Sequence, residues 1–225
     1  MKFERKTSSL SRFERRLIAS KAVLLALVVL AAPTQLFKPA SIHWIEREDR
    51  AATPDARELL RIYPVVRKGM TEASDNSVWT VSKTILQESR RHSLDPFLVL
   101  AVIAVESGFH HSATSTYGAR GLMQIRPFIA PAIAEQWRSA YRPDKQISHD
   151  HPDLENPVVN IKLGVFYLYS LRQSFRDWKL ALTAYNHGPT EVKTRLVEDS
   201  DMPLDYATKV LSTYQDYRRG ASRSD

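Results

Sequence analysis

Glu106 is the residue best suited to acid catalysis, because of the segment that precedes it. Residues 97–105 are nine consecutive apolar residues, Phe-Leu-Val-Leu-Ala-Val-Ile-Ala-Val. A carboxyl group at the end of such a segment is partly desolvated, which disfavours its charged form and raises its pKa. A carboxylic acid that stays protonated near neutral pH can protonate the leaving oxygen of a glycosidic bond. The competing interpretation is a helix-end glutamate that points into water.

Glycines and a Met-Gln pair follow that glutamate closely. Three of the seven glycines fall within fourteen residues: Gly108, Gly118 and Gly121. Such clustering is typical of a backbone shaped for close approach. Met123 and Gln124 then place an apolar, polarizable side chain beside a neutral amide, a combination suited to sugar rings, hydroxyls and acetamido groups. A packed turn with Met123 in the core explains the same residues.

Four motifs in a fixed order make the pattern specific. They are the pair Glu106-Ser107, the block Ser-x-x-Gly-Ala-x-Gly-Leu-Met-Gln-Ile from Ser115 to Ile125, the run Asn-Pro-x-x-Asn-Ile-x-x-Gly from Asn156 to Gly164, and Ala-Tyr-Asn at residues 184–186. Together they resemble the catalytic domain of the soluble-type lytic transglycosylases, which are relatives of goose-type lysozyme. The match covers about residues 78–217. The resemblance implies a mainly α, lysozyme-like helical domain with a glycan-binding cleft.

The resemblance also implies roles for individual residues. Glu106 is expected to be the sole catalytic acid and base, with Ser107 a structural neighbour. The side chains expected to line the glycan groove are Ser115, Met123, Gln124, Tyr185 and Asn186. Gly118 and Gly121 would shape the groove.

The chemistry implied by the family needs one carboxyl group, whereas ordinary glycosidases use two. Glu106 would protonate the oxygen between N-acetylmuramic acid (MurNAc) and N-acetylglucosamine (GlcNAc), while the substrate's acetamido oxygen supports C1. Glu106, now a carboxylate, would deprotonate the muramyl C6 hydroxyl, which closes a 1,6-anhydro ring. No water, metal or other cofactor is expected to take part. A hydrolytic muramidase and an inactive glycan-binding envelope scaffold remain alternatives.

The chain departs from the family pattern at three places. His110-His111 stands where an Asn-Pro pair is usual, and His187 follows the Ala-Tyr-Asn block. Before the final helix tyrosine, Tyr206, the usual acidic and threonine pair is replaced by Met202-Pro203-Leu204-Asp205. The histidine changes leave the four motifs intact. The missing acidic and threonine pair concerns the far end of the groove, where Asp205 is only a weak substitute.

The elements that must position these residues are expected to be helices. From Asn76 to about Arg219 the apolar spacing is helical, and Asp95-Pro96 starts the apolar helix that ends at Glu106. A proline-initiated helix is expected after Gly188, a long loop over residues 138–157, and no strands. The expected organisation is a leader over residues 1–37, a spacer over 38–76 with its helix interrupted at Pro64, the catalytic domain over 77–217 and a polar tail over 218–225.

The leader predicts export. Residues 1–21 carry five of the seven net positive charges, and the apolar run 22–32 follows. A basic segment before an apolar core is typical of a signal peptide, while residues 17–37 are long enough for an uncleaved anchor. Either interpretation leaves the amino terminus in the cytoplasm and places the catalytic domain in the periplasm, with peptidoglycan strands and the inner membrane as partners.

Composition narrows the remaining function classes. Residues 22–225 carry a net charge of only +2, which disfavours nucleic-acid binding. The absence of cysteine excludes disulfides, thiolate metal sites and cysteine nucleophiles. The pairs His110-His111 and His149-x-His151 allow a zinc site as an alternative, but neither has helical ligand spacing with an acidic partner.

Overall fold

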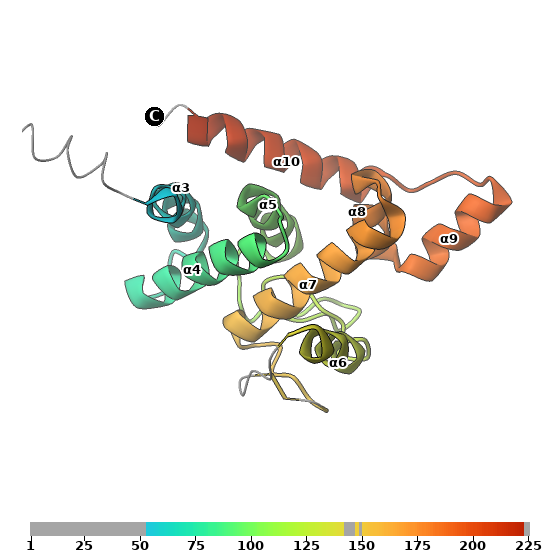
Figure 1. The fold of residues 1–225 in the computed structure, drawn as a ribbon, viewed down its shortest axis with the longest axis horizontal. Helices are drawn as coiled ribbons and strands as arrows, with labels where there is room; N and C mark the ends of the chain where they lie inside the picture. Colours follow the sequence, from blue (N-terminus) through green and yellow to red (C-terminus); the bar gives the residue numbers. More distant parts are fainter. Residues whose placement is uncertain (1–52, 142–146, 149, 223–225) are drawn as a thin grey trace, which may run out of the picture. The chain divides into compact units, whose positions relative to one another are not determined.

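A computed structural model describes residues 53–141, 147–148 and 150–222. These residues form α-helices and no β-strand, apart from isolated bridges that pair Thr114 with Arg120 and Arg120 with Ile125 (Figure 1). The helices are α3 (Pro54–Gly69), α4 (Asp75–Arg91), α5 (Pro96–Ser107), α6 (Ala130–Ala140), α7 (Pro157–Phe175), α8 (Trp178–His187), α9 (Pro189–Glu198) and α10 (Asp205–Ser222). The expectation of a mainly helical domain is therefore confirmed.

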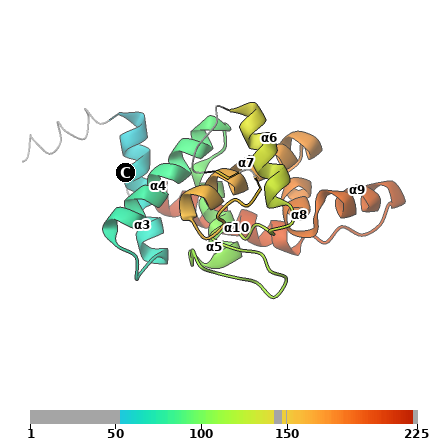
Figure 2. The ribbon, with the colours of Figure 1, turned by 90° about the horizontal axis from the view of Figure 1, so that it is seen from below.

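Helix α5 is the central element, and both of its predicted ends are confirmed. Asp95 Oδ1 accepts a hydrogen bond of 2.9 Å from the Phe97 N–H, and Pro96 occupies the first turn, where its missing N–H costs no helical bond. Gly108 ends the helix in the left-handed conformation, with φ of 56°. Helices α3, α4 and α10 pack against α5 (Figures 1 and 2), so residues 96–103 are all buried.

The expected spacer contains a packed helix, which corrects the sequence prediction. Helix α3 continues through Pro64, where an interruption was expected. Ile62 and Val66 are fully buried in the same core as α5. Burial of this face offsets the backbone hydrogen bond that Pro64 cannot donate.

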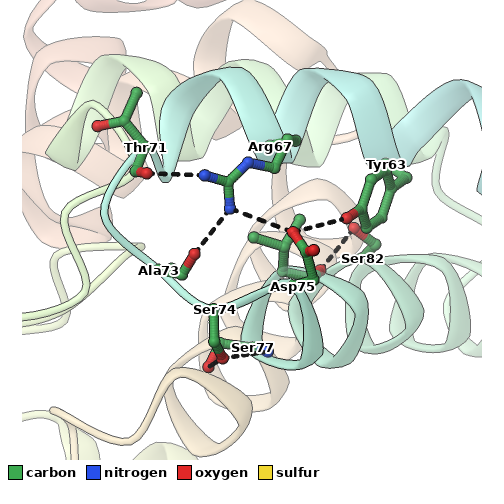
Figure 3. Close-up of polar contacts among 9 residues, drawn as sticks. Tyr63, Arg67, Thr71, Ala73, Ser74, Asp75, Ser77 and Ser82 are labelled. Carbon is green, nitrogen blue, oxygen red and sulfur yellow. Dashed lines mark hydrogen bonds and ion pairs between the residues drawn. The ribbon is translucent and has the colours of Figure 1, made fainter.

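A polar network joins α3 to α4 (Figure 3). The Arg67 guanidinium donates to the carbonyl oxygens of Thr71 and Ala73, each at 2.7 Å, and lies 3.6 Å from Asp75 Oδ1. The Tyr63 hydroxyl donates to the same Asp75 oxygen at 3.3 Å. The turn is thereby held from both helices, and α3 belongs to the folded domain.

A second part of the core lies between α6 and α7. Ile133 and Trp137 of α6 pack with Leu163 and Phe166 of α7, and both views place these helices side by side (Figures 1 and 2). Helix α6 was not among the helices expected from the sequence. It overlaps the predicted loop 138–157 by three residues, and it forms one wall of the cavity described below.

Helix α10 extends beyond the predicted start of the polar tail at Arg218, and Ala221 is buried in the core. Within the described residues, no helix is long and apolar enough to cross a membrane. The predicted leader, including the apolar run 22–32, lies outside the described residues.

Candidate active site

Five of the six residues predicted to act on or bind the glycan line one cavity of about 740 Å³. Its walls come from the end of α5, the loop that follows it, and helices α6 to α9. Five residues singled out in the sequence line it: Glu106, Ser115, Gln124, Tyr185 and Asn186. Segments up to 80 residues apart in the chain therefore meet at Glu106.

Glu106 has the environment of a carboxyl group that keeps its proton near neutral pH. Burial at the end of α5 raises the pKa of Glu106 from 4.5 to about 7. Two smaller effects lower this pKa: a hydrogen bond from Tyr206 and the charge of Arg126. Desolvation prevails, so near neutral pH this group can both give and accept a proton.

Tyr206, the second residue of α10, holds the Glu106 carboxyl group. Its hydroxyl donates to Glu106 Oε1 at 2.5 Å. Burial, and then the nearby Glu106 charge, raise the pKa of Tyr206 well above 10.0, so the hydroxyl stays protonated and remains a donor. One carboxyl oxygen is thus held from α10.

The Ser107 and Tyr185 side chains position the loop that faces Glu106. Ser107 Oγ donates to the Leu122 carbonyl oxygen at 2.8 Å, and the Tyr185 hydroxyl donates to the Met123 carbonyl oxygen at 2.8 Å. The loop is therefore attached to α5 and α8 by adjacent carbonyl groups. Tyr185 also lines the cavity, so the same side chain both holds the loop and forms part of the cavity wall.

Met123 was expected in the groove, but the structure places its side chain in the core. It is fully buried and absent from the lining of the cavity. A Cβ atom on Gly164 of α7 would lie only 2.5 Å from Met123 Sδ. The glycine of the Asn156–Gly164 motif therefore makes room for Met123.

Gly121 is required both by its backbone conformation and by the residues that pack against it. It has φ of 78°, and an added Cβ would lie 2.3 Å from both Asn160 Nδ2 and the Leu154 carbonyl oxygen. Gly118 also has a positive φ, 75°, but open space around it. Gln124 Nε2 donates to the carbonyl oxygens of Ala113 and Gly121, at 3.0 and 2.9 Å. The loop that contributes to the cavity wall is thus tightly folded.

The model of the family described as Transglycosylase SLT domain matches residues 83–204, more than half of the chain. The chain belongs to this family. The matched SLT segment begins within α4 and ends just before α10, so it includes Glu106 and all the described lining residues of the cavity but not Tyr206.

Several curated relatives of this SLT domain are lytic transglycosylases by name. The chain is 31% identical over 140 residues to the membrane-bound lytic murein transglycosylase C of Mannheimia succiniciproducens, covering 58% of this chain and 36% of that protein. It is 34% identical over 84 residues to the membrane-bound lytic murein transglycosylase E of Buchnera aphidicola, covering 37% of each. The matches span little more than a third of the length of these relatives.

Solved structures share the fold of the SLT domain. The lytic transglycosylase Slt of Pseudomonas aeruginosa, solved as an inactive mutant, matches with a TM-score of 0.51 and 27% identity, covering 62% of this chain and 24% of that one. The 70 kDa soluble lytic transglycosylase of Escherichia coli matches with a TM-score of 0.55 and 20% identity, covering 74% and 30%. The second likeness concerns the fold alone.

Two residues important to the geometry of this SLT domain had no role assigned from the sequence. Asn160 is fully buried; its Oδ1 accepts from the Met123 N–H at 2.7 Å, and its Nδ2 donates to the Arg120 and Leu154 carbonyl oxygens, both at 2.9 Å. Asn160 is the second asparagine of the Asn156–Gly164 motif and a polar residue within an apolar part of α7, and both features were available signals. Tyr206 was named in the sequence only as the final helix tyrosine of the family pattern, without a role of its own.

The other carboxylates that the sequence places in loops or at helix starts lie away from Glu106 or outside the described residues. Asp95 caps α5, while Asp150, Asp153 and Glu155 line a different cavity. Asp144 lies outside the described residues, and Asp205 is exposed at the start of α10. Glu191 of α9 does line the cavity, but its Oε1 lies 2.7 Å from Arg195 Nε.

Two of the histidines that depart from the family pattern, His110 and His187, lie in the loop and at the cavity. His110 Nδ1 lies 2.9 Å from the Ser107 carbonyl oxygen and donates to it, whereas His187 lines the cavity beside Asn186. Among the described residues, no three His, Cys, Asp or Glu side chains form a metal-ligand group. His149, one member of the second histidine pair, lies outside those residues.

Proposed function

We propose that the chain is a lytic murein transglycosylase that cleaves the β-1,4 bond between MurNAc and GlcNAc without water. The observation that carries the proposal is the Glu106 carboxyl group, which lines the cavity, is held by Tyr206 and has a pKa of about 7. Membership of the SLT family and the names of the relatives support the same reaction class.

In the first half of the reaction, Glu106 gives its proton to the glycosidic oxygen as the bond to C1 of MurNAc breaks. The acetamido oxygen of the same sugar supports the positive charge that develops at C1. Tyr206 then stabilises the newly formed carboxylate through its hydroxyl donor. A donor that strengthens as charge develops favours the transition state over the bound substrate.

In the second half, the Glu106 carboxylate takes the proton of the muramyl C6 hydroxyl while that oxygen attacks C1. The product is a 1,6-anhydro ring, and Glu106 regains its proton. One group with a pKa near neutrality can serve both steps. The pairing of Glu191 with Arg195 supports a reaction with a single carboxyl catalyst.

The cavity wall suits a chain of sugars. Ser115, Gln124 and Asn186 offer neutral polar groups for hydroxyl and acetamido groups. Tyr117 and Phe128 line the cavity with 83% and 76% of their surface exposed, which leaves aromatic faces free for the apolar faces of sugar rings.

The test is the product released from purified peptidoglycan. The full chain in detergent is expected to release 1,6-anhydromuropeptides, identified by mass spectrometry, and Glu106→Gln is expected to release none above background. Reducing-end muropeptides would instead assign hydrolysis. Strand binding without any product would assign a glycan-binding scaffold.

The proposed location is the periplasm, with the chain either anchored in the inner membrane or released after cleavage of its leader. Five net positive charges before the apolar run 22–32 support a cytoplasmic amino terminus. Membrane fractionation of cells that express the chain with a carboxyl-terminal tag separates the two forms. An anchored protein stays in the membrane fraction at full length.

A further inference from the structure

Arg126 presents a positive charge on the cavity wall that the proposed mechanism does not use. Arg126 is an exposed residue that lines the cavity, and its side chain makes no hydrogen bond or ion pair with any residue that the structure describes. Only one other carboxylate besides Glu106 lines the described part of this cavity, Glu191, and it is already paired with Arg195. Arg126 is therefore available to a ligand.

The Arg126 charge acts on both sides of the cavity. It lowers the pKa of Glu106, at the end of α5, and also lowers that of Tyr167 on α7, although burial prevails at both groups. Arg120, only six residues earlier, behaves differently. It lines another cavity, and its guanidinium lies 3.7 Å from Glu155. Of these two arginines, only Arg126 lines the cavity of Glu106 without an ion-pair partner among the described residues.

A guanidinium group is best matched by a planar anion. Its fork of N–H donors can bind both oxygens of a carboxylate, and such charge-assisted pairs are stronger than neutral hydrogen bonds. Both sugars of the proposed substrate are otherwise neutral. The muramyl sugar alone carries a lactyl group, which ends in a free carboxylate or in a peptide stem that itself carries carboxylates.

We infer that Arg126 binds a carboxylate carried by the muramyl unit and so selects the sugar whose C1 faces Glu106. This inference rests on the proposed function. The lactyl group and C1 belong to the same ring, so a cation that recognises the one has to lie near the acid that acts on the other. Arg126 also neutralises the bound carboxylate, which would otherwise hinder ionisation of Glu106 after it gives up its proton.

Binding is tested in the Glu106→Gln background, where turnover does not interfere. The full chain in detergent is titrated calorimetrically with glycan strands that bear peptides, with peptide-free strands, and with the same strands after conversion of their carboxyl groups to amides. The additional substitution Arg126→Gln is expected to weaken the binding of a charged strand about tenfold, which corresponds to the free energy of one charge-assisted hydrogen bond. Binding of the amidated strands is expected to stay unchanged. Arg120→Gln is the matched control and is expected to change neither the affinity for charged strands nor the affinity for amidated strands.

The pattern across ligands identifies the carboxylate. A loss confined to peptide-free strands assigns the lactyl group, and a loss confined to peptide-bearing strands assigns the stem. Equal affinity with and without Arg126, or an equal loss for charged and amidated strands, overturns the inference. Failure of the proposed function is measured in a separate experiment: the chain with Glu106 intact would then release no anhydro products from peptidoglycan.

Discussion

The two ends of α5 carry two carboxyl groups that receive the same kind of hydrogen bond from the same neighbouring helix. At the amino-terminal end, the Tyr214 hydroxyl donates to Asp95 Oδ2 at 2.8 Å. At the carboxyl-terminal end, the Tyr206 hydroxyl donates to Glu106 Oε1 at 2.5 Å. Both tyrosines belong to α10, which packs along α5 (Figure 1).

The surroundings of the two carboxyl groups differ in every other respect. Asp95 accepts the Phe97 N–H at the positive end of the helix dipole, and Arg218 lies 3.3 Å from its Oδ2. Glu106 lies at the negative end, has no ion pair with a described residue, and is desolvated enough for its pKa to reach about 7. A tyrosine donor alone therefore does not raise the pKa of a carboxyl group; at Glu106 the burial does.

The largest expected effect is the loss of activity in Glu106→Gln. The amide keeps the shape of the side chain but cannot exchange a proton, so the rate of anhydro-product formation is expected to fall about a hundred- to ten-thousand-fold or more. Chromatographic product analysis of digested peptidoglycan measures this. Asp95→Asn, the matched change at the other end of α5, is expected to keep the activity of each folded molecule. Equal losses in both variants would contradict the assignment of Glu106.

The same substitution is expected to stabilise the protein above neutral pH. The Glu106 carboxyl group ionises near 4.5 when unfolded and near 7 when folded. The folded state therefore holds the extra proton between these values, and the free energy of unfolding falls by about 3 kcal/mol as pH rises through this window. Glu106→Gln lacks this loss, so it should match the wild type near pH 4.5 and exceed it at pH 8. Denaturant titrations at both pH values measure the difference, and a constant difference would contradict the raised pKa.

Tyr206→Phe is expected to change the pH dependence as well as the rate. The lost hydrogen bond lowers the pKa of Glu106 in the wild type, so its removal raises that pKa further. The decline of kcat/KM on the alkaline side should therefore move to higher pH, with a maximum about tenfold lower from the lost stabilisation of the carboxylate.

Tyr214→Phe is the control for this variant, because it removes the same hydroxyl from the same helix. Its pH profile is expected to coincide with that of the wild type. If both phenylalanine variants shift the profile, or neither does, Tyr206 has no special effect on Glu106.

Local sequence features predicted α5 and its environment well. Its caps, Asp95-Pro96 and Gly108, are signals contained in adjacent residues, and continuous apolarity predicted its central position. Helix α6 was missed because its eleven residues contain four alanines and only two large buried side chains, Ile133 and Trp137, so its apolar pattern is weak. Pro64 led to the opposite error, a predicted interruption that is absent. The packing of α3 outweighs the one backbone hydrogen bond that Pro64 cannot donate.

The ordered motifs in the sequence predicted which residues would come together in the candidate site. They did not predict contacts between residues that are far apart in the chain. Glu106, Gln124 and Tyr185, which belong to three of the ordered motifs, line one cavity. Met123 belongs to the same motif yet lies in the core, because a motif residue can be required for packing as well as for binding. Tyr206 contacts Glu106 across 100 residues, and no local sequence pattern specifies that contact.

The smallest expected effect is at the amino-terminal end of α5, where the hydrogen bond supports the fold only. Tyr214→Phe is expected to lower the free energy of unfolding by about 1 kcal/mol, and Asp95→Ala by about 1 to 2 kcal/mol because it also removes the helix cap. The double variant should lose less than the sum, because the two residues share one hydrogen bond. Denaturant titrations measure all three proteins, with activity per folded molecule expected to stay constant. Strict additivity would show that the Tyr214–Asp95 bond adds no stability, whereas a fall in activity would mean that both ends of α5 serve the reaction.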